Sequence, residues 1–208
     1  VLATGDPLCY GVGAKLLREG FDCEEIRFLP APSAYSLACA RLGWSLPEVE
    51  TLTVHGRPLE ALHPHIQPRA KLMVLSWDGR SPKAIAELLV QRGFGASRLT
   101  VLENMGGERE QKLAGTAASW NYPEGAALNV VAVECVANEN AQVLPCIPGL
   151  PDEAFTHDGQ LTEREVRALT LAWLQPIPGQ LLWDVGAGCG SVAIEWMRSD
   201  SRCRALAI

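Results

Sequence analysis

The sequence predicts an α/β protein, because short apolar runs alternate with helical patterns along its 208 residues. A glycine-rich turn between an apolar run and a helical pattern supports this class, since glycine allows such a turn to approach a ligand closely. Hydrophobic residues make up 48% of the chain, which is enough for a sizeable core. We therefore expect one large domain or two small ones.

The strands are predicted from apolar runs bounded by turn residues. The candidates are residues 1–4, 24–29, 51–54, 71–75, 98–102, 127–136, 180–184 and 204–208. Helices are predicted between them, three of which have clear start and stop signals. The first is capped by Ser33 and ends at Gly43, with Ala34, Leu37 and Ala38 on its apolar face.

The second predicted helix opens at Ser81-Pro82 and stops at Gly93, and it turns Ile85, Leu88 and Leu89 inward. The third begins at Thr162, which forms a capping box with Glu165. Its apolar face consists of Val166, Leu169, Trp173 and Leu174.

The chain is predicted to contain two domains, residues 1–136 and 151–208. Residues 138–153 have three prolines and no periodicity, so 137–150 are interpreted as a linker. Both ends of the chain have the apolar character of strands and not of frayed termini. We therefore expect an internal fragment, in which the first domain lacks its start and the second lacks its end.

Composition argues against several classes of function. A net charge of −6 gives no basic face for nucleic acid. The seven cysteines are odd in number and have no CxxC spacing, so we expect neither a disulfide framework nor a zinc site. His63 and His65 have no nearby ligand at metal-binding spacing. Without a signal peptide or a membrane-length apolar run, a soluble cytoplasmic protein is expected.

The most informative motif is the turn after Asp184. It contains Gly186, Ala187, Gly188, Cys189 and Gly190 before a helix that opens near Ser191. A dinucleotide site would have G-x-G-x-x-G spacing, whereas this turn has G-x-G-x-G and Ser191. An acidic residue two positions before the first glycine resembles the first motif of class I S-adenosylmethionine-dependent methyltransferases. That resemblance implies that the loop contacts the methionine and ribose portions of the cofactor.

The segment from Pro151 to Arg167 resembles the opening of the decarboxylating carbon-15 methyltransferases of cobalamin biosynthesis. It contains Phe155, His157-Asp158-Gly159, Thr162 and Glu165, followed by Pro178-Gly179 and the glycine loop. The similarity extends over residues 149–208. It implies a Rossmann-like domain in which the cofactor contacts Thr162, Asp184, Gly186, Ala187, Gly188, Cys189 and Gly190.

Three motifs in residues 1–136 together resemble the tetrapyrrole (corrin/porphyrin) methylase family. They are Thr4-Gly5-Asp6-Pro7, Leu29-Pro30-Ala31-Pro32-Ser33-Ala34 and Glu103-Asn104 with Glu108-Arg109. The resemblance implies two α/β lobes with the cofactor between them, in contact with Gly5, Asp6, Cys9, Ser33 and Ala34. From the residues alone, an ordinary turn capped by Asp6 is the favoured interpretation of Gly5-Asp6-Pro7, and Ser33 is a helix cap.

The order of the two resemblances is that of the fused precorrin-6Y methyltransferases. It implies S-adenosylmethionine-dependent methylation of a precorrin at carbons 5 and 15, with decarboxylation of the ring C acetate, by a homo-oligomer. The sulfonium is already a strong electrophile, so in-line transfer needs positioning and no catalytic residue is assigned. His157 or Asp158 either handles a proton or shapes a turn. Arginines are expected to meet the substrate carboxylates, and the candidates are Arg80, Arg109, Arg164 and Arg167.

Three alternatives remain open from the sequence. A nicotinamide-dependent oxidoreductase predicts glycine where Ser191 stands. A non-catalytic interaction module would tolerate loss of Asp184 and the loop glycines, which are present. A methyltransferase that acts at one carbon only would have one inactive half.

Overall fold

The computed structural model describes residues 5–208, so the predicted strand at 1–4 lies outside the described residues. The chain divides into two compact units, residues 1–143 and 144–208. The boundary between them falls inside the predicted linker of residues 137–150. Each unit contains helices and strands, which confirms the α/β class.

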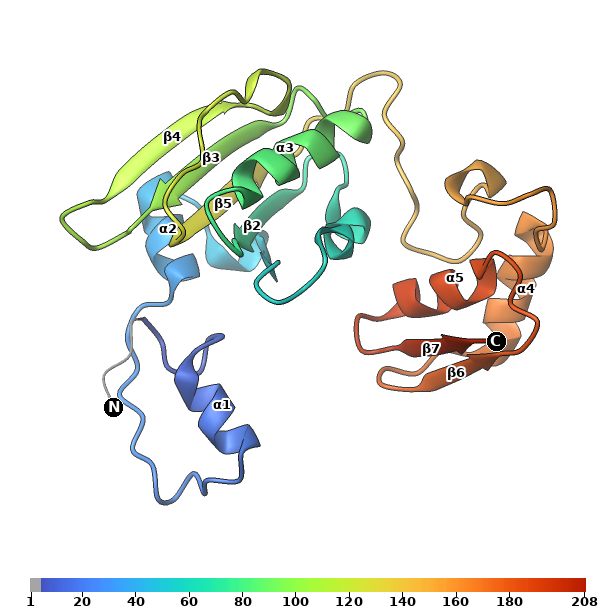
Figure 1. The fold of residues 1–208 in the computed structure, drawn as a ribbon, viewed down its shortest axis with the longest axis horizontal. Helices are drawn as coiled ribbons and strands as arrows, with labels where there is room; N and C mark the ends of the chain where they lie inside the picture. Colours follow the sequence, from blue (N-terminus) through green and yellow to red (C-terminus); the bar gives the residue numbers. More distant parts are fainter. Residues whose placement is uncertain (1–4) are drawn as a thin grey trace. The chain divides into compact units, whose positions relative to one another are not determined.

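The first unit is built on a five-stranded sheet with the order β1-β2-β5-β3-β4 (Figure 1). β1 and β2 are parallel, and the other neighbouring pairs are antiparallel. The strands are β1 (Glu50–Thr53), β2 (Lys71–Leu75), β3 (Arg98–Glu103), β4 (Gln111–Thr116) and β5 (Asn129–Glu134). This arrangement brings the ends of β2, β3 and β5 close together in the middle of the sheet.

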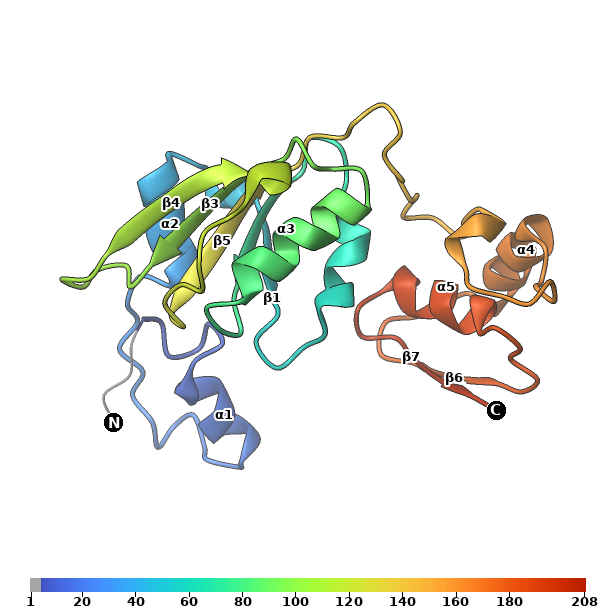
Figure 2. The ribbon, with the colours of Figure 1, turned by 45° about the horizontal axis from the view of Figure 1, so that its top comes forward.

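Helices cover both faces of this sheet, as Figure 2 shows for α2 (Ala34–Leu42) and α3 (Ser81–Gln91). Ala38 of α2 is buried with side chains from one face of the sheet, and Leu89 of α3 with side chains from the other. The remaining elements of this unit are α1 (Val12–Arg18) and the short 3-10 helices η1 (Leu46–Glu48), η2 (Leu59–His65) and η3 (Ala117–Ser119).

The local helix signals of the first unit are confirmed. The Ser33 hydroxyl accepts a hydrogen bond from the backbone N–H of Ser36 at 3.1 Å, and Gly43 ends α2 with a left-handed φ of 67°. α3 begins at Ser81 as expected, with Ile85 and Leu89 buried. Both signals are local, because they depend on residues within one turn of the helix end.

One predicted strand is absent and one observed strand was not predicted, in both cases for reasons of pairing. Residues 24–29 form no strand: the Asp22 carboxylate accepts the backbone N–H of Glu24, which makes a turn, and no described strand pairs with this segment. β4 was missed because only Leu113 of its side chains packs against the core. It is a strand through its six-residue antiparallel register with β3.

The second unit is a parallel β-α-β arrangement preceded by a helix. Its elements are η4 (Asp152–Ala154), α4 (Arg164–Leu174), β6 (Leu181–Asp184), α5 (Ser191–Ser199) and β7 (Arg204–Ala207). β6 and β7 are paired from Leu181↔Arg204 to Asp184↔Ala207, and α5 connects them. Leu171, Trp196 and Cys203 form the buried cluster between the helices and the strands.

The prediction for the start and the buried face of α4 is wrong. The helix begins at Arg164, its N-cap is Glu163, and no side chain caps it, so Thr162 and Glu165 form no capping box. The helix buries Arg167 and Leu171, whereas the predicted face of Val166, Leu169, Trp173 and Leu174 is exposed. Apolar periodicity identified a stripe on α4 but not the stripe that contacts α5.

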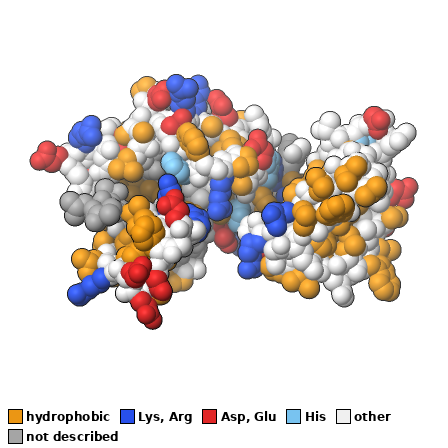
Figure 3. Space-filling view, turned by 60° about the horizontal axis from the view of Figure 1, so that its bottom comes forward, with side chains coloured by type: hydrophobic (Ala, Val, Ile, Leu, Met, Phe, Trp, Pro, Cys, Tyr) orange, Lys and Arg blue, Asp and Glu red, His pale blue; other side chains and the backbone are white. Residues whose placement is uncertain are grey.

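The second unit therefore carries large apolar side chains on its surface. Figure 3 shows hydrophobic side chains gathered over the face of this unit that is in view. Trp173 is 86% exposed and Trp183 is 66% exposed, which makes them the most exposed tryptophans of the described residues. No helix within residues 5–208 combines the length and the apolar character needed to cross a membrane.

Candidate functional site

The residues predicted from the resemblance of residues 1–136 to tetrapyrrole methylases converge on a cavity of about 160 Å³ in the first unit. Gly5, Asp6, Cys9 and Ala34 line it, together with residues at or just beyond the ends of the central strands, among them Leu102, Met105 and Asn129. Ser33 is not part of the lining, because its hydroxyl is engaged in the cap of α2. The structure thus brings four of the five predicted residues together and places Ser33 next to them.

The turn at Asp6 is shaped by its own side chain. The Asp6 carboxylate accepts the backbone N–H of Leu8 at 2.8 Å and that of Cys9 at 3.1 Å. Gly5 precedes it with a φ of +69°, which favours glycine. The capping role expected from the residues alone is therefore present, and the same turn forms one wall of the cavity.

Glu103 itself lies away from this cavity. The Glu103 side chain is buried and accepts the backbone N–H of Ala126 at 2.9 Å. It lines a separate cavity of about 310 Å³ with Arg80 and Trp120, on the α3 side of the sheet. Glu108 and Arg109 are exposed. The motif is therefore divided between the two cavities: Leu102 and Met105, which flank Glu103-Asn104, line the cavity with Asp6, whereas Glu103 lines the other one.

The glycine loop of the second unit starts where β6 ends at Asp184. Gly186, Gly188 and Gly190 have φ values of +77°, +56° and +73°, a conformation that side chains with a Cβ rarely adopt. A Cβ added to any of the three would meet no atom within 4 Å. Glycine is thus required here by backbone conformation, and the space above the loop is open.

Polar groups of this loop are left for a ligand. The N–H of Gly186 donates to the Ile208 carbonyl at 2.8 Å, which ties the loop to the end of β7. The N–H groups of Gly188 and Cys189 donate to no acceptor within residues 5–208. One carboxylate oxygen of Asp184 is buried and, over the same residues, accepts no hydrogen bond. The arrangement offers N–H donors and one acceptor at the N-terminal end of α5.

Thr162 lies on the segment before α4, and no hydrogen bond connects it to the glycine loop within the described residues. His157 and Asp158 are exposed, and each accepts a backbone N–H two residues ahead, from Gly159 at 3.1 Å and from Gln160 at 3.0 Å. They shape this turn, which is one of the two interpretations given for them above.

His63 Nδ1 lies 2.8 Å from the Arg92 guanidinium. Residues 5–208 contain no cluster of three His, Cys, Asp or Glu side chains that could hold a metal ion.

Comparison with known families identifies the first unit. Residues 1–120 match the family model described as tetrapyrrole (corrin/porphyrin) methylases. The chain belongs to this methylase family. Residues 153–208 match a second model, described as a precorrin methyltransferase domain.

Individual relatives agree with the two models. The methylase is 50% identical over 208 residues to a precorrin-6Y C(5,15)-methyltransferase [decarboxylating] from Sinorhizobium sp, with 100% of this chain and 50% of the relative covered. A protein of the same description from Mycobacterium tuberculosis is 42% identical over 212 residues, covering 100% and 51%. The solved C-terminal domain of the Rhodobacter capsulatus precorrin-6Y C5,15-methyltransferase is 50% identical, covers 31% of this chain and 34% of that one, and has a TM-score of 0.30. The chain spans about half the length of the curated relatives it matches.

An ion pair that no sequence signal indicated lies near the first cavity, although neither of its residues lines that cavity. Arg41 of α2 binds Glu110 through two hydrogen bonds, Nε to Oε1 at 2.5 Å and Nη2 to Oε2 at 3.0 Å. Glu110 Oε2 also accepts the backbone N–H of Gly106 at 2.7 Å, next to Met105 in the cavity wall. The pair therefore links α2 to the loop that follows β3. Its two residues are 69 positions apart, so no local signal could reveal it.

This ion pair predicts a pH dependence of stability. The hydrogen bond from Arg41, with that from Gly106, lowers the pKa of Glu110 from 4.5 to about 2. Because the folded pKa is depressed, the contribution of Glu110 to stability is present above pH 4.5 and is lost as the pH falls toward 2. In thermal unfolding, the advantage of the wild type over Glu110→Gln should shrink across this range. Glu108→Gln is the control, and an advantage that stays constant with pH would contradict the prediction.

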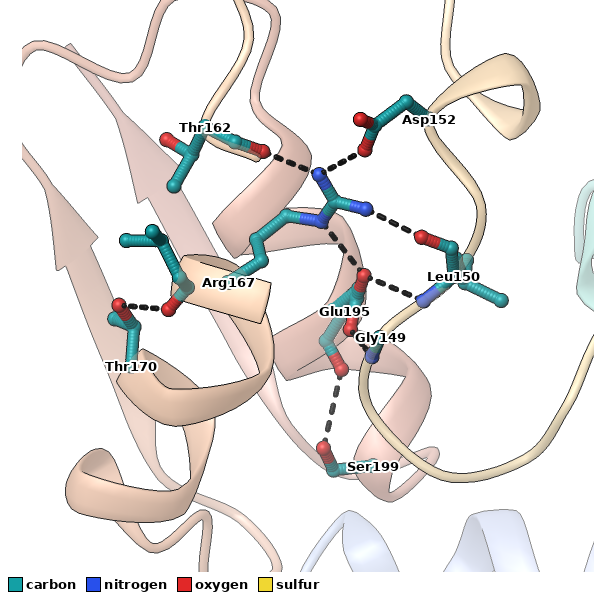
Figure 4. Close-up of polar contacts among 9 residues, drawn as sticks. Gly149, Leu150, Asp152, Thr162, Arg167, Thr170, Glu195 and Ser199 are labelled. Carbon is teal, nitrogen blue, oxygen red and sulfur yellow. Dashed lines mark hydrogen bonds and ion pairs between the residues drawn. The ribbon is translucent and has the colours of Figure 1, made fainter. Parts of the chain in front are cut away.

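A second ion-pair network that the sequence did not indicate lies in the interior of residues 144–208. Arg167, a candidate for binding substrate carboxylates, is completely buried and is bound by Glu195 and Asp152 (Figure 4). Burial acts to lower the pKa of Arg167, but the hydrogen bonds to Glu195 and Asp152 outweigh it and raise that pKa. Arg167 therefore cannot reach a substrate, and the prediction of that role is wrong. Arg80 is exposed but paired with Glu124 at 3.0 Å.

Proposed function

We propose that the protein containing this chain transfers methyl groups from S-adenosylmethionine to carbons 5 and 15 of a precorrin and decarboxylates its ring C acetate. The residues at the first donor site are proposed to be Gly5, Asp6, Cys9, Ser33 and Ala34. Those at the second are proposed to be Thr162, Asp184, Gly186, Ala187, Gly188, Cys189 and Gly190. The proposed domains are residues 1–136 and 151–208, joined by 137–150.

The observation that carries this proposal is the glycine loop with its unused polar groups. A methyl donor of this class presents hydroxyl and ammonium donors and a carboxylate acceptor. The buried oxygen of Asp184 can accept from a donor, and the N–H groups of Gly188 and Cys189 can bind an anionic group. The three positive φ values keep this face free of side chains. The residues present therefore fit the donor.

The first cavity supports the proposal by its position and its lining. Its volume of about 160 Å³ is below the ≈ 300–1,000 Å³ of common small-molecule sites, so it accommodates part of a donor. Leu102 and Met105 give it an apolar wall, while the Asp6 turn supplies polar atoms. We propose that the nucleoside end of the donor lies against these residues.

Methyl transfer from a sulfonium requires the protein mainly to align the donor with the ring carbon. The donor supplies an electrophilic methyl group on a sulfonium, and its sulfur keeps the bonding electron pair when the new carbon–carbon bond forms. The loop and the cavity hold the donor so that this methyl group lies in line with the ring carbon. In the decarboxylation, the bond to the carboxylate breaks, carbon dioxide leaves, and a proton replaces it on the former acetate carbon. We assign no catalytic residue to that proton.

The carboxylates of the substrate need cationic partners. Arg109 and Arg164 are exposed and make no ion pair within residues 5–208, so we propose that these two meet substrate carboxylates. All seven cysteines lie within the described residues and are free thiols, which supports the proposal of a cytoplasmic enzyme. The homo-oligomer stays a prediction, which light scattering of the intact protein would check.

The test is a calorimetric titration of the intact protein with S-adenosylhomocysteine, in which we expect two sites. Gly188→Asp should abolish one site, because it places a side chain at a φ of +56° in the space proposed for the donor. Asp6→Arg should abolish the other, because it removes the acceptor that shapes the turn.

Matched controls exist for both variants. Gly179 has a φ of +90° and equally open surroundings but lies outside the loop, so Gly179→Asp should leave both sites intact. Asp22→Arg removes a similar turn acceptor away from the cavity and should also change nothing. A single site in the wild type would favour methylation at one carbon. Binding of a nicotinamide cofactor instead of S-adenosylhomocysteine would refute the proposal.

A further inference from the structure

Arg167 is the centre of a hydrogen-bond network between α4, α5 and the segment that leads to α4 (Figure 4). Its Nε donates to Glu195 Oε1 at 2.8 Å, and Nη1 donates to Asp152 Oδ1 at 2.9 Å. Nη1 also donates to the Thr162 carbonyl, and Nη2 donates to the Leu150 carbonyl. One guanidinium thus binds four residues that are spread over 46 positions of the chain.

Glu195 completes this network from the other side. Its Oε2 accepts the N–H of Gly149 at 2.6 Å, and its Oε1 accepts the N–H of Leu150 at 3.0 Å. Glu195 lies in α5, the helix that the glycine loop opens. Gly149, Leu150, Asp152 and Thr162 all precede α4, and apart from η4 this stretch has no regular structure of its own. Arg167 and Glu195 therefore fix the stretch to the helix that follows the loop.

The contact with Thr162 connects the network to a residue that is proposed to bind the methyl donor. Figure 4 shows the Thr162 carbonyl facing Arg167 while its side chain points away from the network. The side chain makes no hydrogen bond within residues 5–208 and does not cap α4. Its position is thus set through the backbone by Arg167, and its hydroxyl remains available.

We propose that Arg167 and Glu195 are positioning residues for the methyl donor, because they hold Thr162 and the residues before it in place relative to the glycine loop. This inference rests on the proposed function. The planar guanidinium has five N–H donors in a fixed fork, so it can bind two carboxylates and two carbonyls at once. A lysine ammonium has three N–H donors, so it could not make all four of these contacts. A site built on such fixed contacts loses affinity when they are displaced by about 1 Å.

The experiment separates positioning from a purely structural role. Three variants of the intact protein are titrated with S-adenosylhomocysteine: Arg167→Lys, Arg167→Met and the double variant Arg167→Met/Glu195→Met. The double variant removes both buried charges together, so its stability should return toward that of the wild type, whereas Arg167→Met alone leaves Glu195 buried and unpaired. Donor affinity at the loop should stay reduced by about tenfold or more in both the double variant and Arg167→Lys.

Amide hydrogen exchange of residues 149–162, measured without donor, is the second readout, and it should increase in all three variants. Arg202→Met is the matched control, because Arg202 forms an exposed ion pair with Asp200 just beyond α5. It should change neither readout. Donor affinity that recovers in the double variant together with stability would overturn the inference.

Failure of the proposed function would look different. In that case the Gly188→Asp variant would bind S-adenosylhomocysteine at the same number of sites as the wild type. The inference would then be refuted together with the proposed function. If Gly188→Asp does abolish a site and Arg167→Lys retains full affinity there, only the positioning role is refuted.

Discussion

Replacing Glu195 by alanine should lower the free energy of unfolding of residues 144–208 by about 3–5 kcal/mol, the usual cost of breaking a buried ion pair. The side chains of Arg167 and Glu195 are 0% and 1% exposed. Without Glu195, the guanidinium would keep only Asp152 as a charged partner, and the N–H groups of Gly149 and Leu150 would lose their acceptor. A buried charge whose remaining partner is 40% exposed and two unpaired donors act in the same direction.

Hydrogen exchange of the peptides that cover α4 and α5 measures this loss locally in the intact protein. Arg202→Ala is the comparison, because it removes an ion pair of the same type in which Arg202 is 69% exposed. We expect that variant to cost less than about 1 kcal/mol. A loss of the same small size for Glu195→Ala would mean that water reaches the Arg167 network.

Gly11→Ala should disrupt the proposed first donor site through a steric clash. The added Cβ would lie 2.6 Å from the Pro7 carbonyl oxygen and 2.7 Å from that of Asp6, both backbone atoms that cannot rotate away. The φ of Gly11 is −95°, which any residue adopts, so the effect is one of space alone. We expect a cost of about 1–3 kcal/mol and displacement of the Asp6 turn, with loss of donor binding at the first cavity.

Thermal unfolding and the titration with S-adenosylhomocysteine together check this prediction. Gly107→Ala is the control, because its nearest atom, the Asn104 carbonyl oxygen, would lie 3.3 Å away and its φ is not positive. The control should keep both sites. Unchanged stability and affinity in Gly11→Ala would show that the turn at Asp6 does not pack against the start of α1.

The two proposed donor sites differ in how their residues are supplied. The glycine loop is one continuous stretch, so its geometry follows from the sequence between Asp184 and Ser191. The first cavity combines the Asp6 turn, the start of α2 and the ends of β2, β3 and β5. Motif similarity could predict Asp6 and Ala34 there. Leu102 and Met105 belong to the motif around Glu103-Asn104, but no local signal indicated that these two residues, and not Glu103, line the cavity.

Features set by neighbouring residues were predicted from the sequence. Ser33 caps α2, Gly43 ends it, and Gly186, Gly188 and Gly190 take positive φ values, because caps and turns depend on atoms a few positions away. β2 was predicted with its observed bounds, since an apolar run buried between two helical layers is a strand whichever neighbour it pairs with.

Features set by distant residues were decided only by the tertiary structure. β4 is a strand because β3 pairs with it, while residues 24–29 have no described strand to pair with. The buried stripe of α4 is the one that contains Arg167, because Glu195, 28 positions later, compensates its charge. A burial pattern or an ion pair depends on which segments meet, and residues tens of positions apart meet only in the folded chain.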